Sequence, residues 1–428
     1  ALGRRAMASA SLLASTTQRP TTPGVSAPRR SPNRPRMPSA VATASPRDGD
    51  DVTRHFPDEM RAACEAVRLA SIVCVETQRT LTIGEKVSKS DDSPVTVADF
   101  AAQCIVTSVL RESHPDIQMV AEESADDLRG EANAPLLDRV TSLVNKVILR
   151  ADSEKEKPED GSMVRLMFNE EVADAIDLGG KTDPSRSGKY WVLDPIDGTK
   201  GFINKRQYAI ALALMDDGEI VGGVLGCPNM PSEPIPPGAT EIPSEPPGVI
   251  FFAFKNKGAW TAPMTHPDPT GAVGDGRVTF RATDAGAVMR IATEATHTHG
   301  RDASYMESWG DSIVAAHDVT LKLTTALGVV NPPARIDSMA KYGALARGDT
   351  DVYLRFPPET YREKVWDHAA GAAVVTEAGG VITDGAGKRL DFAASRFLDV
   401  KGGIVASGTA ELHEKLLWQI EAQGLLER

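Results

Sequence analysis

Hydrophobic residues recur at helical intervals along residues 58–80, where Met60, Ala63, Cys64 and Val67 share one face. This spacing predicts a helix. Residues 99–110 predict a second, shorter helix, with Asp99 leading into it. Short apolar runs predict buried strands at 118–121, 190–193 (ending at Asp194-Pro195), 208–215, 220–226 and 249–254. The Asp-Asp-Gly-Glu sequence at 216–219 predicts a hairpin turn, and the polar, acid-rich residues 124–188 predict helices bordered by a loop.

The second half of the chain alternates between strand-like and helix-like segments, which favours an α/β layer. Strands are expected at 278–281, 334–336, 351–354, 381–383 and 403–406, and helices at 311–327, 340–346 and 369–378. Eight prolines in 227–248 predict a surface loop. A Pro-, Gly- and Asp-rich stretch at 261–277 predicts a domain boundary, giving a leader (1–50), an α+β domain with most metal ligands (51–270) and an α/β domain with substrate contacts (271–428).

Charge is distributed unevenly. Residues 1–47 hold eight of the 47 basic residues, all Arg, and no acid, so the rest of the chain holds 39 basic residues against 59 acids, a balance of −20. Such an acidic body repels polyanions, which argues against nucleic acid as a bulk partner. The Arg-, Ser-, Thr- and Pro-rich leader is typical of an organelle transit peptide. We expect a plastid address, with the mitochondrion or a plain disordered tail as alternatives.

Other sequence features suggest no additional site. No run of eighteen apolar residues occurs, so we expect no membrane span, and we expect a monomer. The four cysteines form no metal-binding spacing, which favours buried reduced thiols; a regulatory Cys64–Cys74 disulfide is the alternative. His297 and His299 form a His-x-His pair, which we interpret as part of a polar loop because no third ligand lies nearby in the sequence.

The clearest chemical signal is Asp194-Pro-Ile-Asp-Gly-Thr199. Two carboxylates three residues apart, beside a proline and a glycine, can converge on one point, and the Ile196 carbonyl lies between them. Hard cations such as Mg²⁺ prefer oxygen ligands of this kind. Gly198 permits a tight turn, and the Thr199 amide could bind phosphate at the start of a helix. The alternative is a plain surface turn, since Asp, Pro and Gly all form turns.

Three distant acids strengthen the metal interpretation. Glu122 follows a predicted strand, Asp367 opens a helix of small residues, and Asp99 ends the segment Asp92-Ser-Pro-Val-Thr-Val-Ala-Asp99. Each of the last two could instead be a helix N-cap.

Together these motifs resemble the lithium-sensitive, magnesium-dependent phosphatase superfamily of inositol monophosphatase, and most closely its 3′(2′),5′-bisphosphate nucleotidase branch. The resemblance extends from residue 58 to the C-terminus. It is carried further by three segments: Ile336-Asp-Ser-Met-Ala-Lys-Tyr342, Asp351-Val-Tyr-Leu-Arg355 and Tyr361-Arg-Glu-Lys-Val-Trp-Asp-His-Ala-Ala-Gly371. It implies a layered α-β-α-β-α sugar-phosphatase fold, two or three Mg²⁺ ions, and inhibition by Li⁺ or Na⁺.

Position by position, the resemblance assigns roles to individual residues. The implied metal ligands are Glu122, Asp194, Ile196 (through its carbonyl), Asp197 and Asp367. The implied pair that activates the attacking water is Asp99 and Thr199, joined by a hydrogen bond. The implied substrate contacts are Gly198, Thr199, His317, Ser338, Lys341, Arg355 and Asp367.

The implied reaction is hydrolysis of 3′-phosphoadenosine 5′-phosphate to AMP and phosphate, with 3′-phosphoadenylyl sulfate as a second substrate. The segment Glu307-Ser-Trp-Gly-Asp-Ser-Ile-Val-Ala-Ala-His-Asp318 departs from the branch's Gly-His-Ser-Ser-His-Asp-like pattern, so base recognition stays open. One alternative is an inositol polyphosphate 1-phosphatase or a dual-specificity relative. An alternative of another class is a catalytically silent nucleotide-binding sensor.

Overall fold

The computed structural model describes the greater part of residues 56–426. The described residues are 56–81, 94–154, 164–236, 239, 242–270, 277–278, 291–293, 311–329, 331, 333–357 and 361–426. At 94–95, 277–278, 291–293 and 311–318 only the backbone is described. The leader and the His297–His299 pair therefore lie outside the described residues. None of the described helices is both long and apolar enough to cross a bilayer.

The larger sheet is a meander with one parallel edge pair. Within the described residues it holds seven strands in chain order, with β1 parallel to β2 and each later pair antiparallel. The strands are β1 (Gln118–Ala121), β2 (Lys189–Asp197), β3 (Ala209–Asp216), β4 (Glu219–Cys227), β5 (Val249–Phe254), β6 (Gly258–Pro263) and β7 (Arg277–Val278). The predicted turn between β3 and β4 is confirmed, with positive φ angles at Asp217 and Gly218 as this hairpin type requires.

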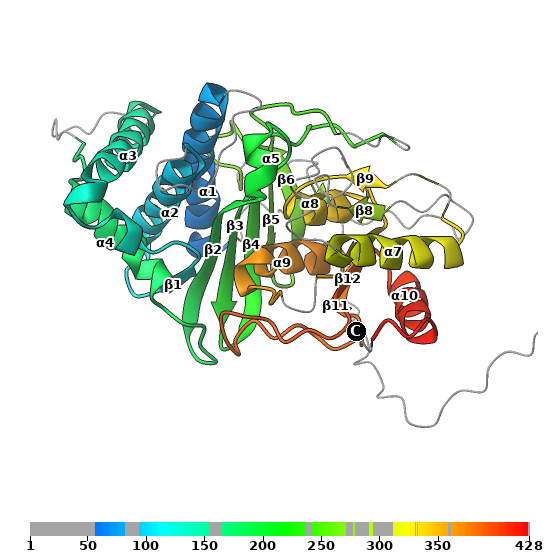
Figure 1. Ribbon diagram of the computed structural model, residues 1–428. Coiled ribbons are helices and arrows are strands. Elements are labelled where there is room, and N and C mark those ends of the chain that lie inside the picture. The colour runs from blue at the N-terminus through cyan, green and yellow to red at the C-terminus, as the bar shows by residue number, and fades with distance from the viewer. Residues whose placement is uncertain are drawn as a thin grey trace, which may run out of the picture. The chain divides into compact units, whose positions relative to one another are not determined.

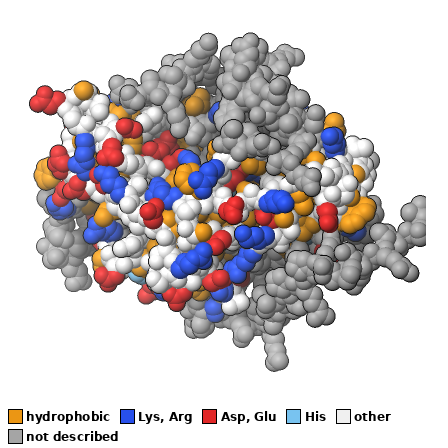
Figure 2. Space-filling model, turned by 60° about the horizontal axis from the view of Figure 1, so that its bottom comes forward, with side chains coloured by type: hydrophobic (Ala, Val, Ile, Leu, Met, Phe, Trp, Pro, Cys, Tyr) orange, Lys and Arg blue, Asp and Glu red, His pale blue; other side chains and the backbone are white. Residues whose placement is uncertain are grey.

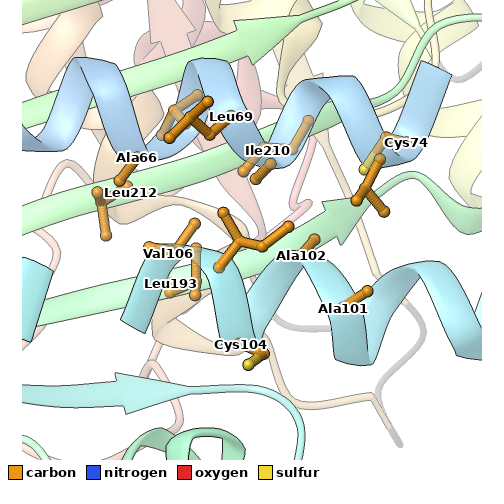
Figure 3. Packing of buried hydrophobic residues seen from close by; sticks show 14 of the residues in the cluster. Ala66, Leu69, Cys74, Ala101, Ala102, Cys104, Val106, Leu193, Ile210 and Leu212 are labelled. Carbon is orange, nitrogen blue, oxygen red and sulfur yellow. The ribbon is translucent and has the colours of Figure 1, made fainter. Parts of the chain in front are cut away.

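Helices cover one face of this sheet. α1 (Asp58–Thr80) packs on β3, β4 and β5, and α2 (Pro94–Ser113) packs on α1 and β2. Figure 3 shows Ala66 and Leu69 of α1 and Ala102 and Val106 of α2 meeting Leu193, Ile210 and Leu212 of the sheet. α3 (Ala134–Glu154) and α4 (Asn169–Gly180) pack against α2, with the 3₁₀ turns η2 (Ala125–Leu128) and η3 (Glu131–Asn133) between β1 and α3.

The opposite face of the large sheet is covered by α8 (Ala340–Arg347) and α9 (Ala369–Glu377), which follows the 3₁₀ turn η4 (Val365–Asp367). These helices separate it from a second sheet of order β11-β12-β10-β8-β9. Its strands are β8 (Ile291–Thr293), β9 (Ala334–Arg335), β10 (Val352–Arg355), β11 (Val381–Asp384) and β12 (Ile404–Ser407). α7 (Asp311–Ala326) and α10 (Ala410–Ala422) lie beyond it (Figure 1). The predicted α-β-α-β-α layering is confirmed.

Two local expectations were wrong, and one alternative is excluded. α2 begins at Pro94, a residue favoured in the first turn of a helix because it needs no amide donor, so Asp99 lies inside the helix and is not its N-cap. β2 continues past Asp194 to Asp197. The Cys64–Cys74 disulfide is also excluded: both residues lie in α1, where ten residues span about 15 Å, far beyond disulfide reach. All four thiols are buried and free.

Other features of the chain were not foreseen or stay open. β6, β8 and α10 were not predicted, while the domain boundary at 270/271 stays a prediction. Figure 2 shows acidic and basic side chains interspersed over the described part of one face.

Candidate metal and catalytic site

The acidic motif lies at the irregular end of β2. The pairing of β2 with β3 shifts register between Asp194 and Asp197, where Pro195 supplies no amide hydrogen to the ladder. Residues three apart in a regular strand point to opposite faces, but an extra residue re-aims the chain. Asp197 accordingly acts on the charge of Asp194, and Ile196 between them is buried.

Asp194 is the centre of a cluster of carboxylates. Its side chain is only 2% exposed, and burial raises its pKa well above the ordinary value. Four other acids raise it further: Glu122, Asp197, Asp367 and Asp99, in that order. They come from four different segments: the residue after β1, the end of β2, η4 and α2. The structure thus brings together all five acids that the sequence singled out.

Asp367 shares this environment. Burial raises its pKa to about 7, Asp197 and Glu122 add to the rise, and His368 and Arg355 oppose it. Tyr361 Oη donates a hydrogen bond to Asp367 Oδ2 over 3.2 Å. Asp367 ends η4, and His368 is the residue that precedes α9, so Asp367 is not the helix N-cap either.

A lysine pairs with one of these acids. Lys364 Nζ lies 2.9 Å from Glu122 Oε1 and 5.3 Å from the centre of the Trp366 ring. Burial alone lowers the pKa of Lys364, but Glu122, Asp367 and Asp194 outweigh it and the pKa is raised. The lysine therefore stays protonated and offsets part of the negative charge.

The turn after β2 brings the second half of the chain against the acids. Gly198 has a φ of 84° and leads into α5 (Thr199–Ile203), and a Cβ atom at Gly198 would lie 2.6 Å from the Ser338 Cβ. The Met339 amide donates to Asp197 Oδ2, and Ser338 itself has a φ of 70°. Only glycine allows this close approach, which places Ser338 beside Gly198. α5 also contacts α2, the helix of Asp99; the Asp99–Thr199 hydrogen bond stays a prediction.

Of the two predicted substrate cations, Lys341 lies in α8 just after this loop, and Arg355 acts on Asp367 of the acid cluster. Lys341 is 1% exposed, donates to the Ile336 carbonyl over 3.3 Å and lies over the Tyr353 ring at 5.2 Å. Arg355 at the end of β10 lies over the Tyr361 ring at 5.7 Å. The side chain of His317 in α7 lies outside the described residues.

Sequence reasoning missed the roles of Tyr361, Glu363, Lys364 and His368. All four stand in the segment Tyr361–Gly371 that carried the resemblance, but their positions showed no periodicity. One carboxylate or imidazole atom from each of Glu363, Asp367 and His368 lies within 4.8 Å of the other two. Glu363 and His368 are bonded to each other over 2.9 Å, so this group is a hydrogen-bonded network that borders the acid cluster.

The donor set fits a divalent cation. Asp194 Oδ1 is buried and has no hydrogen-bond partner among the described residues, a costly arrangement unless something binds it. Carboxylates that raise each other's pKa repel when all are ionised, and hard cations with oxygen ligands relieve this repulsion. Glu122, Asp194, Asp197, Asp367 and the Ile196 carbonyl are the groups that would hold Mg²⁺.

Comparison with known proteins agrees with this geometry. The model of the inositol monophosphatase family matches residues 57–424. The chain belongs to the inositol monophosphatase family. Its relatives include "3'(2'),5'-bisphosphate nucleotidase" of Oryza sativa, 41% identical over 355 residues, which are 82% of this chain and 90% of that protein. Another is "3',5'-bisphosphate nucleotidase 2" of Arabidopsis thaliana, 36% identical over 82% of this chain and 93% of that protein.

Two further proteins also match the chain. "3'(2'),5'-bisphosphate nucleotidase" of Schizosaccharomyces pombe is 35% identical over 82% of this chain and 92% of that protein. An inositol monophosphatase structure from Zymomonas mobilis is 19% identical, covers 85% of this chain and 98% of its own, and has a TM-score of 0.47. The inositol monophosphatase family comprises metal-dependent phosphatases, generally with Mg²⁺.

Proposed function

We propose that the chain is a 3′(2′),5′-bisphosphate nucleotidase that hydrolyses 3′-phosphoadenosine 5′-phosphate to AMP and inorganic phosphate. A second proposed substrate is 3′-phosphoadenylyl sulfate, which would give adenylyl sulfate. The observation that carries the proposal is the convergence of four acids on buried Asp194, with one carboxylate oxygen left without a partner. The names of relatives that are 35–41% identical over most of the chain support the substrate class.

The chain's own residues supply binding and proton transfer in this scheme. Two or three Mg²⁺ ions, held by the acid cluster, would lower the pKa of the attacking water and neutralise charge on the phosphoryl oxygens. A threonine hydroxyl is no base by its own pKa. Asp99 would therefore accept the Thr199 proton as Thr199 accepts one from water. The oxygen of water bonds to phosphorus, the bond from phosphorus to the ribose oxygen breaks, and that oxygen takes a proton from solvent.

The rest of the substrate needs cations, because the body of the protein is acidic. Lys341 and Arg355 would bind the second phosphate. Ser338, Gly198 and the helix start at Thr199 would line the part of the site that lies between the two phosphates of the substrate. His317 would contact the nucleoside. Arginine and lysine suit these roles because charge-assisted hydrogen bonds to phosphate are strong.

Activity measurement tests the proposal directly. With Mg²⁺, the purified protein is expected to release phosphate from 3′-phosphoadenosine 5′-phosphate, and Thr199→Ala should lower kcat by about 10²–10⁴-fold. Thr199→Ser, which keeps the hydroxyl, is the matched control and should retain most activity. Colorimetric phosphate release measures all three.

The alternatives give different results in the same assay. Equal efficiency on an inositol polyphosphate would show that the nucleotidase label is too narrow and favour the dual-specificity relative. Binding of the adenosine bisphosphate without phosphate release from any bisphosphate would refute the enzyme proposal and favour the silent sensor.

We also propose that residues 1–50 direct import into the plastid. The family match begins at residue 57, and the preceding segment is rich in Arg and free of acids up to Asp48, as transit peptides are. Residues 1–56 fused to a fluorescent protein are expected to reach plastids in leaf cells. Replacement of the eight Arg of residues 1–47 by Gln is the control and should leave the fusion outside the plastid. Delivery to mitochondria would contradict the plastid assignment.

A further inference from the structure

The buried carboxylate of Glu363 binds the Nε side of the Arg355 guanidinium. Glu363 is fully buried, and its Oε1 accepts a hydrogen bond from Arg355 Nε over 2.7 Å. Arg355 itself is 26% exposed, so the guanidinium reaches from the protein interior toward the surface. Burial by itself raises the pKa of Glu363, but Arg355 and His368 outweigh it and bring the pKa to about 2. The carboxylate is therefore ionised at any working pH.

Glu363 is fixed in turn by a second layer of groups. Its Oε2 pairs with His368 Nε2 over 2.9 Å, and His368 Nδ1 pairs with Tyr342 Oη over 2.7 Å. His368 and Tyr342 are 2% and 1% exposed. Tyr342 packs edge-on against Tyr353, the ring beneath the Lys341 ammonium. A buried chain of hydrogen bonds, called the relay below, thus runs from Arg355 through Glu363 and His368 to Tyr342, the residue after Lys341.

One side chain, that of Tyr361, separates the Arg355 guanidinium from the acid cluster. Arg355 lies over the ring of Tyr361, whose hydroxyl donates to Asp367, and Arg355 lowers the pKa of Asp367. An arginine recognises phosphate through the fixed plane of its guanidinium, so small rotations of that plane change which phosphate position it can reach. A buried ion pair is costly to desolvate and contributes little to stability by itself.

We propose that Glu363 is a positioning residue that, with His368 and Tyr342, fixes Arg355 for the phosphate that is not cleaved and so sets the preference for bisphosphates. This inference rests on the proposed function. It assigns no contact with the reacting atoms to Glu363, which acts through Arg355 alone.

Two substrates that share the scissile 3′-phosphate test the proposal. They are 3′-phosphoadenosine 5′-phosphate, called the bisphosphate below, and adenosine 3′-monophosphate, which lacks the second phosphate. Glu363→Gln keeps the side-chain size and loses the charge. We expect it to raise KM for the bisphosphate about 10–100-fold, the range for a lost hydrogen bond to a charged group, and to change kcat less than threefold. KM for the monophosphate should stay unchanged.

A matched control separates positioning from loss of stability. Asp349 is likewise buried and accepts from Arg347 over 2.7 Å, but it has no part in the proposed site. Asp349→Asn should lower the melting temperature and leave the ratio of the two KM values unchanged. In a double-mutant cycle, Glu363→Gln should add little to Arg355→Lys, because both act on one contact.

Different outcomes separate this inference from the proposed function. If the wild type releases no phosphate from the bisphosphate, the proposed function fails. If the wild type prefers the bisphosphate and Glu363→Gln keeps that preference, or raises both KM values equally, the positioning role is refuted. Should Glu363→Gln fail to fold, Tyr342→Phe carries the test, since it removes only the end of the relay. It is expected to raise KM for the bisphosphate by about threefold or more with no change for the monophosphate, and an unchanged ratio would again refute the role.

Discussion

Asp194→Asn is expected to lower kcat/KM by at least about 10³-fold, which corresponds to a loss of about 4 kcal/mol of transition-state stabilisation. The asparagine keeps the size of the side chain and removes the anionic oxygen at the centre of the proposed metal site. The same change is expected to raise the melting temperature of the metal-free protein. Burial and four neighbouring acids disfavour the Asp194 carboxylate, and a neutral amide relieves that repulsion.

The opposite signs for activity and stability make this test specific. Phosphate release measures the first, and thermal unfolding in a chelator measures the second. Asp349→Asn is the control, because it breaks a favourable ion pair with Arg347 and should lower the melting temperature while activity persists. Activity of Asp194→Asn within tenfold of the wild type would exclude Asp194 as a metal ligand.

Removal of Mg²⁺ is expected to reveal a contribution of Asp367 to stability that falls as pH rises from about 4 to about 7. The pKa of Asp367 is about 7 in the folded protein, against an ordinary value of 3.8. Within this window the folded state holds a proton that the unfolded state has lost, so the free energy of unfolding decreases with pH. Each pKa unit corresponds to about 1.4 kcal/mol, which limits the effect of Asp367 to about 4 kcal/mol. Above pH 7 the loss is complete.

Several groups act on this titration. Those facing Asp367 are His368 and Arg355, which oppose the rise of its pKa, Asp197 and Glu122, which add to it, and the Tyr361 hydroxyl. A second titratable side chain, His413, has the opposite effect on stability. Burial lowers its pKa to about 4. The unfolded chain therefore binds a proton there that the folded protein lacks, and stability rises from about pH 4 to 6.5.

Asp367→Asn separates the two contributions, because His413 is common to both proteins. The measurement is the melting temperature in a chelator at pH 5, 6, 7 and 8, for the wild type and for the variant. The stability of the wild type relative to the variant should decrease with pH up to about 7, and Mg²⁺ should abolish the decrease. A relative stability that is flat or rises over this range would contradict the raised pKa of Asp367.

Much of the fold could be predicted from local pattern. α1 and β5 have the predicted bounds, since a long amphipathic period and a short apolar run bounded by Gly and a polar turn each specify one element. The misplaced start of α2 has a local cause: Pro94 and the residues after it carry no strong apolar period, so Asp99 was the first visible signal. α10 was missed because only His413, Leu416 and Ile420 of its face are buried.

The candidate site likewise has features that the sequence determined and features that only the tertiary structure decided. The sequence by itself determined the donor chemistry, because Asp194, Asp197, Glu122 and Asp367 are oxygen ligands whatever their surroundings. Only the tertiary structure decided that the pKa of Asp194 is raised well above its ordinary value, since pKa shifts depend on burial and on charges brought from distant segments. It likewise decided that Lys364 pairs with Glu122, 242 residues away, and that Glu363 holds Arg355. Local patterns carry no information on contacts between different elements, which form only when the two sheets and the helices between them pack.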